Sequence, residues 1–222
     1  GKAVSSAITW FFENVEEGII LEDECVPNKD FFVYCEELLN YYRDNKEIMV
    51  IGGNNFQNGV KRGDASYYFS AFSHIWGWAT WARAWKLYDF KLENIKEEDL
   101  DSLLGYYFLN KSHVKYWKYI FKKLKSGAID TWDYQLLFTI WENKLLAIVP
   151  NVNLVSNIGF GGGTHTRDIK DIAANMAKYE ILPIIHPAKI ELCREADDYY
   201  YKIFLKSSFF KKIKDKIKML IV

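Results

Sequence analysis

The chain has 222 residues, of which half are hydrophobic and 17% are aromatic, and its 29 Lys and Arg balance its 29 Asp and Glu. This length and composition predict one globular domain with a sizeable buried core, and they exclude a disordered, collagen-like or coiled-coil chain. Zero net charge argues against a general nucleic-acid-binding protein, which needs an excess of Lys and Arg to neutralise phosphates. The three cysteines are too few and too scattered for a disulfide framework or a zinc site, so they indicate ordinary thiols of a reducing compartment.

The sequence carries no signal for membrane insertion or export. Charged residues interrupt the apolar stretches before they reach the roughly 18 to 20 residues of a membrane span. No basic segment followed by an apolar run opens the chain, so we expect a cytoplasmic protein. The first residue is Gly1 rather than Met, and the chain begins within a helical pattern, which indicates a piece of a longer polypeptide.

Helices and strands alternate in the first part of the chain. Residues 3–14 have helical apolar spacing, and the apolar run 19–21 that follows predicts a buried strand. Asp30 is expected to cap a helix over 30–44, and the apolar run 48–51 before two glycines predicts a second buried strand. This alternation predicts an α/β layer with a mostly parallel sheet, whose ligands gather at the carboxyl ends of the strands.

Aromatic residues and helices dominate the middle of the chain. A polar, Gly-rich loop over 54–66 precedes the densest aromatic tract, residues 67–85. Beyond this tract the patterns predict helices over 97–109, 113–125 and 132–142, a strand over 145–149 and a loop over 151–166. Asp130 or Thr131 is expected to cap the third of these helices.

The end of the chain is basic and amphipathic. Residues 202–222 carry seven lysines and one acid, a local charge of +6, and their apolar side chains recur every three or four positions. This pattern predicts a helix. Such a helix can lie in a membrane interface and attract anionic lipids, or its apolar stripe can pack against the domain or a partner.

Three consecutive acids, Glu22, Asp23 and Glu24, stand at the end of the first predicted strand. Like charges this close raise one another's pKa unless a cation lies among them. Carboxylate oxygens suit Mg²⁺ or Mn²⁺, which in phosphate chemistry bind one or two carboxylates together with phosphate oxygens of the substrate. The triplet therefore indicates either a solvated surface turn or a metal site.

Several stretches resemble one known family in chain order. Residues 18–27 (GIILEDECVP) are similar to the D-x-D region of GT-A fold glycosyltransferases, whose common form in relatives of this type is I-L-E-D-D-C-x-P. The similarity continues through residues 74–81 (HIWGWATW), 132–135 (WDYQ) and 157–166, and it covers about residues 3–166. The resemblance is to bacterial nucleotide-diphospho-sugar transferases and, more loosely, to N-acetylglucosaminyltransferases that carry E-D-D and W-D-x-W.

This resemblance implies a fold and an organisation. It implies a GT-A-like, Rossmann-like mixed sheet flanked by helices in residues 1–166, followed by a connecting segment over 167–201 and the amphipathic helical tail 202–222. The family carries a nucleotide-binding βαβ segment before the acidic turn. The resemblance therefore implies that this chain is a fragment lacking most of that segment.

The resemblance also implies how the acidic triplet binds its ligands. Glu24 would ligate the Mn²⁺ or Mg²⁺ that holds the donor's diphosphate, Asp23 would face the donor ribose or sugar, and Glu22 would lie beside them. The family's usual final Asp is Glu24 in this sequence, and the glutamate side chain is one methylene longer.

The aromatic tract contains four tryptophans within ten positions: Trp76, Trp78, Trp81 and Trp85. Their flat rings either pack the core or form a wall of a sugar site, because indole faces suit the C–H faces of a sugar. In the family comparison this tract faces the donor sugar and the acceptor. We expect a sugar wall, with Gly77 allowing close backbone approach and His74 as a polar contact.

Asp133 lies at the start of a predicted helix, where the macrodipole alone favours an ionised carboxylate. Inverting sugar transfer needs a carboxylate to take the proton of the acceptor hydroxyl, and Asp133 occupies the matching place in the W-D-x-W-like segment. We expect Asp133 to be the general base, with Asp130 in reserve. His165, in the Gly-rich loop 159–165, either contacts metal or diphosphate or is simply solvated.

The sequence thus predicts a metal-dependent, inverting glycosyltransferase that moves a sugar from a nucleotide-diphosphate-sugar donor to a hydroxyl of a glycan or lipid-linked acceptor. Peripheral contact with the inner membrane face through the tail would suit such an acceptor. One alternative is a non-catalytic sugar-binding or interaction module derived from a truncated glycosyltransferase. Another is a glycoside hydrolase with Asp23 and Asp133 as paired acids. His113 and His186 have no predicted partners.

Overall fold

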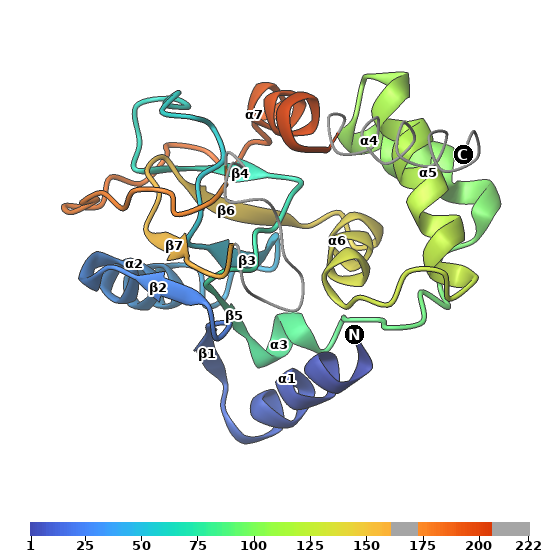
Figure 1. The fold of residues 1–222 in the computed structure, drawn as a ribbon, viewed down its shortest axis with the longest axis horizontal. Coiled ribbons are helices and arrows are strands. Elements are labelled where there is room, and N and C mark those ends of the chain that lie inside the picture. The colour runs from blue at the N-terminus through green and yellow to red at the C-terminus, as the bar shows by residue number, and fades with distance from the viewer. Residues whose placement is uncertain (161–172, 206–222) are drawn as a thin grey trace, which may run out of the picture.

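The protein is a mixed α/β structure in which a mixed sheet is flanked by helices (Figure 1). The computed structural model describes residues 1–160 and 173–205. The five-stranded sheet has the order β1 (Glu17–Ile20), β5 (Trp78–Trp81), β3 (Ile48–Gly52), β6 (Leu146–Pro150) and β4 (Tyr67–Ser70). A two-stranded sheet pairs β2 (Cys25–Pro27) with β7 (Val155–Asn157).

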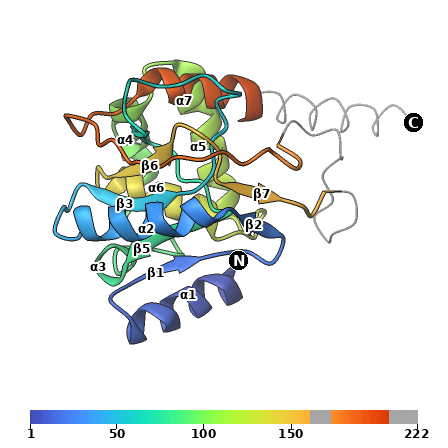
Figure 2. The ribbon, with the colours of Figure 1, turned by 90° about the vertical axis from the view of Figure 1, so that its left-hand side faces the viewer.

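The main helices are α1 (Lys2–Asn14), α2 (Lys29–Tyr41), α3 (Ala82–Trp85), α4 (Leu100–Tyr107), α5 (Lys111–Lys125), α6 (Asp133–Glu142) and α7 (Arg194–Tyr200). A 3₁₀ turn, η1 (Glu97–Asp99), leads into α4, and a π-helical turn, η2 (Tyr201–Leu205), follows α7. Figures 1 and 2 show α2 on one face of the five-stranded sheet and α6 on the other. Within residues 1–160 and 173–205, no helix has the length and apolar character needed to cross a bilayer.

The sheet is mixed, so the prediction of a mostly parallel sheet was wrong. Strands β3 and β6 are parallel, whereas the β1–β5, β3–β5 and β4–β6 pairs are antiparallel. The antiparallel strands β4 and β5 both come from the aromatic tract, and β5 inserts between β1 and β3. Sequence alternation of helices and strands cannot reveal such an insertion, because it depends on pairing between segments that are distant in the chain.

The two strands predicted early in the chain differ in burial. Strand β3 is buried along its whole length, as predicted, because β5 and β6 lie on either side of it. Strand β1 is an edge strand whose four residues are only half-buried, and Leu21 after it is 40% exposed. The prediction of a buried strand over 19–21 is therefore corrected to a half-buried edge strand.

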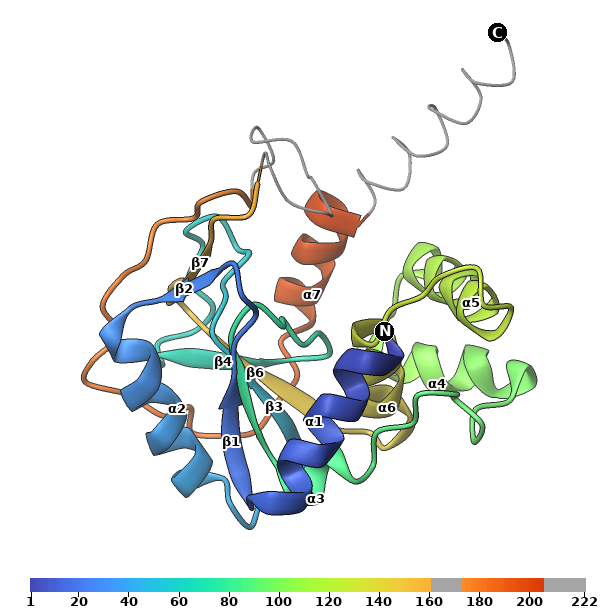
Figure 3. The same cartoon turned by 60° about the horizontal axis from the view of Figure 1, so that its bottom comes forward.

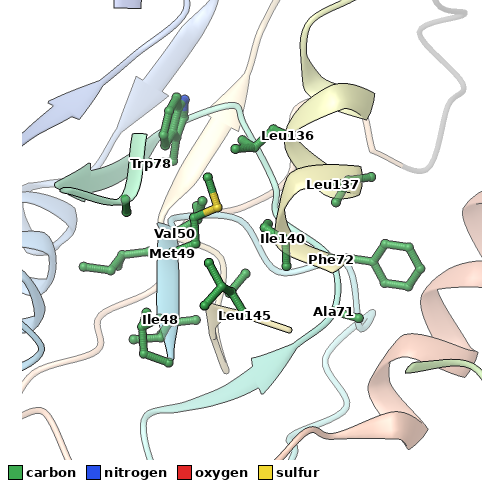
Figure 4. Close-up of a cluster of buried hydrophobic side chains, with 14 of the residues drawn as sticks. Ile48, Met49, Val50, Ala71, Phe72, Trp78, Leu136, Leu137, Ile140 and Leu145 are labelled. Atoms are coloured by element: carbon green, nitrogen blue, oxygen red, sulfur yellow. The ribbon is translucent and has the colours of Figure 1, made fainter. Parts of the chain in front are cut away.

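The aromatic tract supplies much of the core. All residues of β4 and β5 are buried, and Trp85 of α3 is 4% exposed. Figure 4 shows Leu136 and Ile140 of α6 facing Val50 of β3, with Trp78 of β5 beside them. This packing holds the N-terminal end of α6 close to β5.

The helices predicted between residues 3 and 142 are found, but the caps of two of them differ from those expected. Helix α2 is capped by Asn28, whose side chain accepts a hydrogen bond from Phe31 N at 3.0 Å. Asp30, the expected cap, is instead 3% exposed and accepts from Ile181 N at 3.1 Å. The Asp30 carboxylate is thus bound by the backbone of the connecting segment. Rules for helix caps consider only neighbouring residues and do not include such a long-range contact.

Helix α6 also begins differently. Trp132 occupies its N-cap position, and the hydroxyl of Thr131 donates to the Asp133 carboxylate. Asp130 pairs with the amine of Gly1 at 2.9 Å. The expectation that Asp130 or Thr131 caps this helix is thus corrected.

The connecting segment contains a helix that packs on the sheet. Leu192 forms a parallel bridge with Phe69 of β4, and Asp197 of α7 is 2% exposed. The Asp197 carboxyl accepts from Ser70 Oγ at 2.5 Å and from Ala71 N at 3.0 Å. Of the predicted tail helix, only residues 202–205 lie within the described part of the chain, in η2.

Candidate functional site

The acidic turn connects the two sheets. After β1 the chain turns, with Cys25 N donating to the Glu22 carbonyl at 3.0 Å, and then enters β2. Glu22 and Glu24 are half-buried and Asp23 is exposed. The turn therefore presents three carboxylates, two of which are partly removed from water.

Asp133 lies close enough to this turn to affect the titration of Glu22. Burial raises the pKa of Glu22 from 4.5 to about 7, and the charge of Asp133 is the next largest cause, ahead of Asp23 and Glu24. The tertiary structure thus brings the predicted base and the predicted metal ligands into one group of four carboxylates, Glu22, Asp23, Glu24 and Asp133, which we call the acidic cluster. Concentrated negative charge that is partly desolvated favours either a proton or a cation.

Buried aromatic rings fix the position of Asp133. The preceding residue, Trp132, is 6% exposed, and its ring stacks on Trp78 with 5.7 Å between centroids. The hydroxyl of Tyr88 donates to the Trp132 carbonyl at 3.0 Å. The Thr131 hydroxyl then orients the half-buried Asp133 carboxylate. The start of α6 is therefore held rigidly against β5.

Most of the tryptophans expected to form a sugar wall belong to the core. Trp78 and Trp81 are 0% and 2% exposed, and the indole of Trp81 donates to the Leu39 carbonyl at 3.1 Å. The indole of Trp85 donates to Thr9 Oγ1 at 3.0 Å. These rings cannot contact a sugar in this structure, because other side chains cover both of their faces. They position Asp133 and β5 instead.

Trp76 is the half-buried one of the four tryptophans, and it joins a separate group of rings. Its centroid lies 5.3 Å from Phe56 and 5.8 Å from Phe160. Phe204 of η2 lies 5.1 Å from Phe56 and stacks on Tyr200 at 5.4 Å. We call these five residues the aromatic cluster. Phe56, Tyr200 and Phe204 were missed by sequence reasoning because they come from separate segments that share no spacing pattern.

His74 lies beneath the aromatic cluster. It is 6% exposed, and its ring contacts those of Phe56 and Tyr200 at centroid distances of 4.6 and 4.8 Å. Burial lowers the pKa of His74 to about 3, so the imidazole is neutral at physiological pH. The expected polar contact between His74 and a sugar is therefore corrected to a packing role.

Two glycines allow the motifs to approach one another. A Cβ added at Gly77 would lie 2.8 Å from Val155 Cγ2 and 3.2 Å from Leu21 Cδ2. A Cβ added at Gly159 would overlap the carboxylate of Glu24. Gly77 thus accommodates neighbouring protein side chains rather than a ligand. Gly159 brings the Asn157–Phe160 segment directly against the acidic turn.

The carboxylates suit a hard divalent cation, although they do not form a complete ligand set. In residues 1–160 and 173–205, no three His, Cys, Asp or Glu side chains are arranged to hold a metal ion. The predicted ligand His165 lies outside the described residues. One or two carboxylates are nevertheless what Mg²⁺ takes from a protein when a phosphate supplies the remaining oxygens. The donor set of Glu24 and Asp23 fits that kind of site.

The site is distinguished by its carboxylates rather than by a deep cavity. Two surface hollows of about 400 Å³ each lie along α5 and include no member of the acidic cluster. A divalent cation that binds phosphate needs accessible carboxylate oxygens more than an enclosed volume, so the acidic cluster is the better candidate.

The two remaining histidines have partners away from this site. His113 is fully buried, its Nε2 lies 3.5 Å from an Asp198 oxygen, and burial lowers its pKa to about 4. His186 Nδ1 lies 2.7 Å from Tyr67 Oη, and its Nε2 lies 3.3 Å from Glu37 Oε1. Both histidines attach the C-terminal part of the described chain to the body of the protein.

Comparison of the chain with models of known protein families finds no match. Comparison with curated proteins finds no match either.

Proposed function

We propose that the protein is a metal-dependent, inverting glycosyltransferase of GT-A type, which moves a sugar from a nucleotide-diphosphate-sugar donor to a hydroxyl of a glycan or lipid-linked acceptor. The observation that carries this proposal is the proximity of Asp133 to the acidic turn, expressed in the raised pKa of Glu22. Sugar transfer needs a base and a site for a diphosphate within reach of the same anomeric carbon.

The residues of the acidic cluster have different roles in this reaction. Glu24 would hold the divalent cation, which when bound would stabilise the charge of the departing nucleoside diphosphate, and Asp23 would face the donor ribose or sugar. Asp133 takes the proton of the acceptor hydroxyl while that oxygen attacks the anomeric carbon and the bond to the diphosphate breaks. The Thr131 hydroxyl keeps the Asp133 carboxylate oriented for this step.

The aromatic cluster supplies a surface for the sugar. Trp76 and Phe160 are half-buried, and Phe160 follows Gly159, which touches Glu24. Aromatic faces bind the apolar C–H faces of sugar rings. This arrangement puts a stacking surface within a few residues of the cation ligand.

The first test is a thermal-shift titration with Mn²⁺ and a panel of nucleoside diphosphates and nucleotide sugars, because a ligand that binds the native state raises its melting temperature. We expect a manganese-dependent shift that is selective for one nucleotide. No shift with any member of the panel would contradict donor binding by this chain.

Transfer assays then test the base. Asp133→Asn should reduce the rate of transfer by about 10²- to 10⁴-fold while leaving the donor-induced thermal shift intact, since Asp133 acts on the acceptor. Asp130→Asn tests the reserve base, and Glu13→Gln on α1 is the matched control for loss of a surface carboxylate. Unchanged transfer by Asp133→Asn would contradict the role of Asp133.

A non-catalytic sugar-binding module is the second candidate. It is favoured by the incomplete metal ligand set of the described residues and by the packing of the Glu24 carboxylate against Gly159. Binding of a glycan without any donor-induced shift would favour this candidate. Glycan hydrolysis in the absence of a nucleotide would favour the glycoside hydrolase alternative instead.

We also propose that the protein works in the cytoplasm at the inner face of the membrane, where a lipid-linked acceptor would lie. The support is the sequence of residues 202–222, with seven lysines among regularly spaced apolar residues. Residues 206–222 of this tail lie outside the described part of the chain.

A further inference from the structure

An apolar tip marks the corner where α4 ends and α5 begins. Leu109, between the two helices, is 79% exposed, and Tyr106 in the last turn of α4 is 52% exposed. Tyr119, on the exposed side of α5, is 44% exposed. An isolated exposed leucine needs no explanation, but Leu109 follows the exposed Tyr106 by three residues, and a second exposed tyrosine, Tyr119, lies on the next helix; tyrosine rings favour the boundary between apolar and aqueous phases.

The helix behind this tip is strongly basic. Helix α5 contains no acid and six lysines, which are Lys111, Lys115, Lys118, Lys122, Lys123 and Lys125. Lys118 pairs with Asp101 and Lys122 with Glu97, each at 2.6 Å. Lys125 donates to the backbone carbonyls of residues 91 and 92. Within residues 1–160 and 173–205, two of the six lysines therefore have a carboxylate partner, and the ammonium of Lys123 lies over the Tyr119 ring, 5.6 Å from its centroid.

Two of the lysines without a carboxylate partner in the described part of the chain lie in the first turns of α5, next to the tip. Lys111 and Lys115 are exposed and have no ion-pair partner in residues 1–160 and 173–205. The ammonium of Lys144 lies over the Tyr106 ring, 5.6 Å from its centroid. We call the set of Tyr106, Leu109, Lys111, Lys115, Tyr119 and Lys144 the α4–α5 corner. This set contains three lysines and no acid, whereas the chain as a whole is neutral.

The corner projects from the molecule and lies beside the start of the basic tail. Figures 1 and 3 show α4 and α5 beyond α6, on the side away from the main sheet. The hydroxyl of Tyr201 in η2 donates to the Ser112 carbonyl at 3.1 Å, and the Tyr201 ring packs on His113 at 3.6 Å between centroids. The next residue, Lys202, is the first of the seven lysines of the tail.

We propose that the α4–α5 corner is a docking surface for an anionic lipid bilayer. Leu109 enters the interface, Tyr106 and Tyr119 lie at the level of the head groups, and the lysines meet lipid phosphates. An apolar tip with lysines beside it suits such an interface, because the apolar side chain can insert between the lipids while the lysines are attracted to the anionic head groups. The two contributions to binding add to each other. A soluble polyanion would bind the lysines but would gain nothing from contact with the exposed leucine.

The proposal is tested by co-sedimentation of the full chain with vesicles of phosphatidylcholine alone or with added phosphatidylglycerol. We expect binding only to the anionic vesicles. Lys111→Gln with Lys115→Gln should weaken it about 25-fold, since each lysine near an anionic surface contributes about fivefold. The matched control is Lys46→Gln with Lys86→Gln, which removes the same charge from exposed positions elsewhere.

Leu109→Ser tests the apolar part separately, with Leu87→Ser as its control because Leu87 is also exposed, at 43%. We expect the first to weaken vesicle binding several-fold and the second to leave it unchanged, with both variants melting like the parent protein. Binding that is equal for the corner variants and their controls would overturn the proposal.

Two further arms distinguish the corner from the basic tail and from a general polyanion-binding surface. One arm changes Lys211, Lys212 and Lys214 to Gln, which removes charge from the tail. If this variant no longer binds anionic vesicles while the corner variants bind like the parent protein, binding belongs to the tail alone and the proposal is overturned. Binding of the protein to a soluble polyanion such as heparin, without binding to anionic vesicles, would also overturn it. Transfer activity is not part of any arm, so failure here is distinct from failure of the proposed reaction.

Discussion

Replacing Glu22 by Gln should stabilise the folded protein above neutral pH. Burial, together with neighbouring carboxylates, raises the pKa of Glu22 from 4.5 to about 7. The folded state therefore holds this proton more tightly than the unfolded chain. Folding stability consequently falls as the pH rises from about 4.5 to about 7 and stays at the lower level above that. Gln carries no charge, so the variant escapes this loss.

The size of the effect follows from the shift. A change from 4.5 to about 7 corresponds to about 3 kcal/mol of free energy at alkaline pH, which is an upper value. Because Glu22 is only half-buried, solvent reduces the expected stabilisation to about 1–2 kcal/mol. The matching substitution Glu13→Gln on α1 removes an exposed carboxylate and serves as the control.

Urea unfolding of the parent protein and of Glu22→Gln at several pH values provides the measurement. We expect the two free energies of unfolding to be close near pH 4 and to diverge to about 1–2 kcal/mol near pH 8. Titrating groups that do not interact with Glu22 contribute equally to both proteins and cancel in the difference. Equal stabilities near pH 8 would refute the argument.

A divalent cation should restore the stability that the folded protein loses when Glu22 becomes charged. Mn²⁺ neutralises the acidic cluster, so at pH 8 it should raise the melting temperature of the parent protein more than that of Glu22→Gln. An equal increase for both proteins would mean that the cation binds elsewhere.

Three other substitutions test the packing around the site. Trp78→Ala should cost about 3–5 kcal/mol of stability in urea unfolding, because the ring is fully buried and supports the start of α6; a cost below about 1 kcal/mol would contradict its core role. Gly159→Ala should abolish the manganese-induced thermal shift by displacing the Glu24 carboxylate, whereas Gly105→Ala, where an added Cβ meets nothing within 4 Å, should not. Asp197→Asn should flatten the fall in stability between about pH 4 and pH 7, because burial raises the pKa of Asp197 from 3.8 to about 7; an unchanged pH profile would count against it.

Local patterns were enough to locate most helices and the central strand. Apolar spacing predicted α1 over almost its observed length, and the run Ile48–Ile51 predicted the buried strand β3. These elements follow from periodicities of a few residues, which a single sequence displays. The caps failed where a distant segment supplied the hydrogen bond, as Ile181 does for Asp30.

The candidate site was predicted in its parts but not in its assembly. The acidic turn and Asp133 were chosen from the sequence, yet the sequence could not show that Asp133 lies near Glu22. Its proximity to Glu22 depends on the stacking of Trp132 on Trp78 and therefore on the insertion of β5 beside β1.

The sequence by itself determined that the protein is an α/β structure and located most of its helices and the central strand, because these depend on composition and on neighbours along the chain. Only the tertiary structure decided that Trp78 and Trp81 are core residues, that Trp76 joins rings from other segments, and that β5 pairs between β1 and β3. An indole ring is suited both to a core and to a sugar site. Its role is set by which distant segments cover it, and that is a property of the folded chain alone.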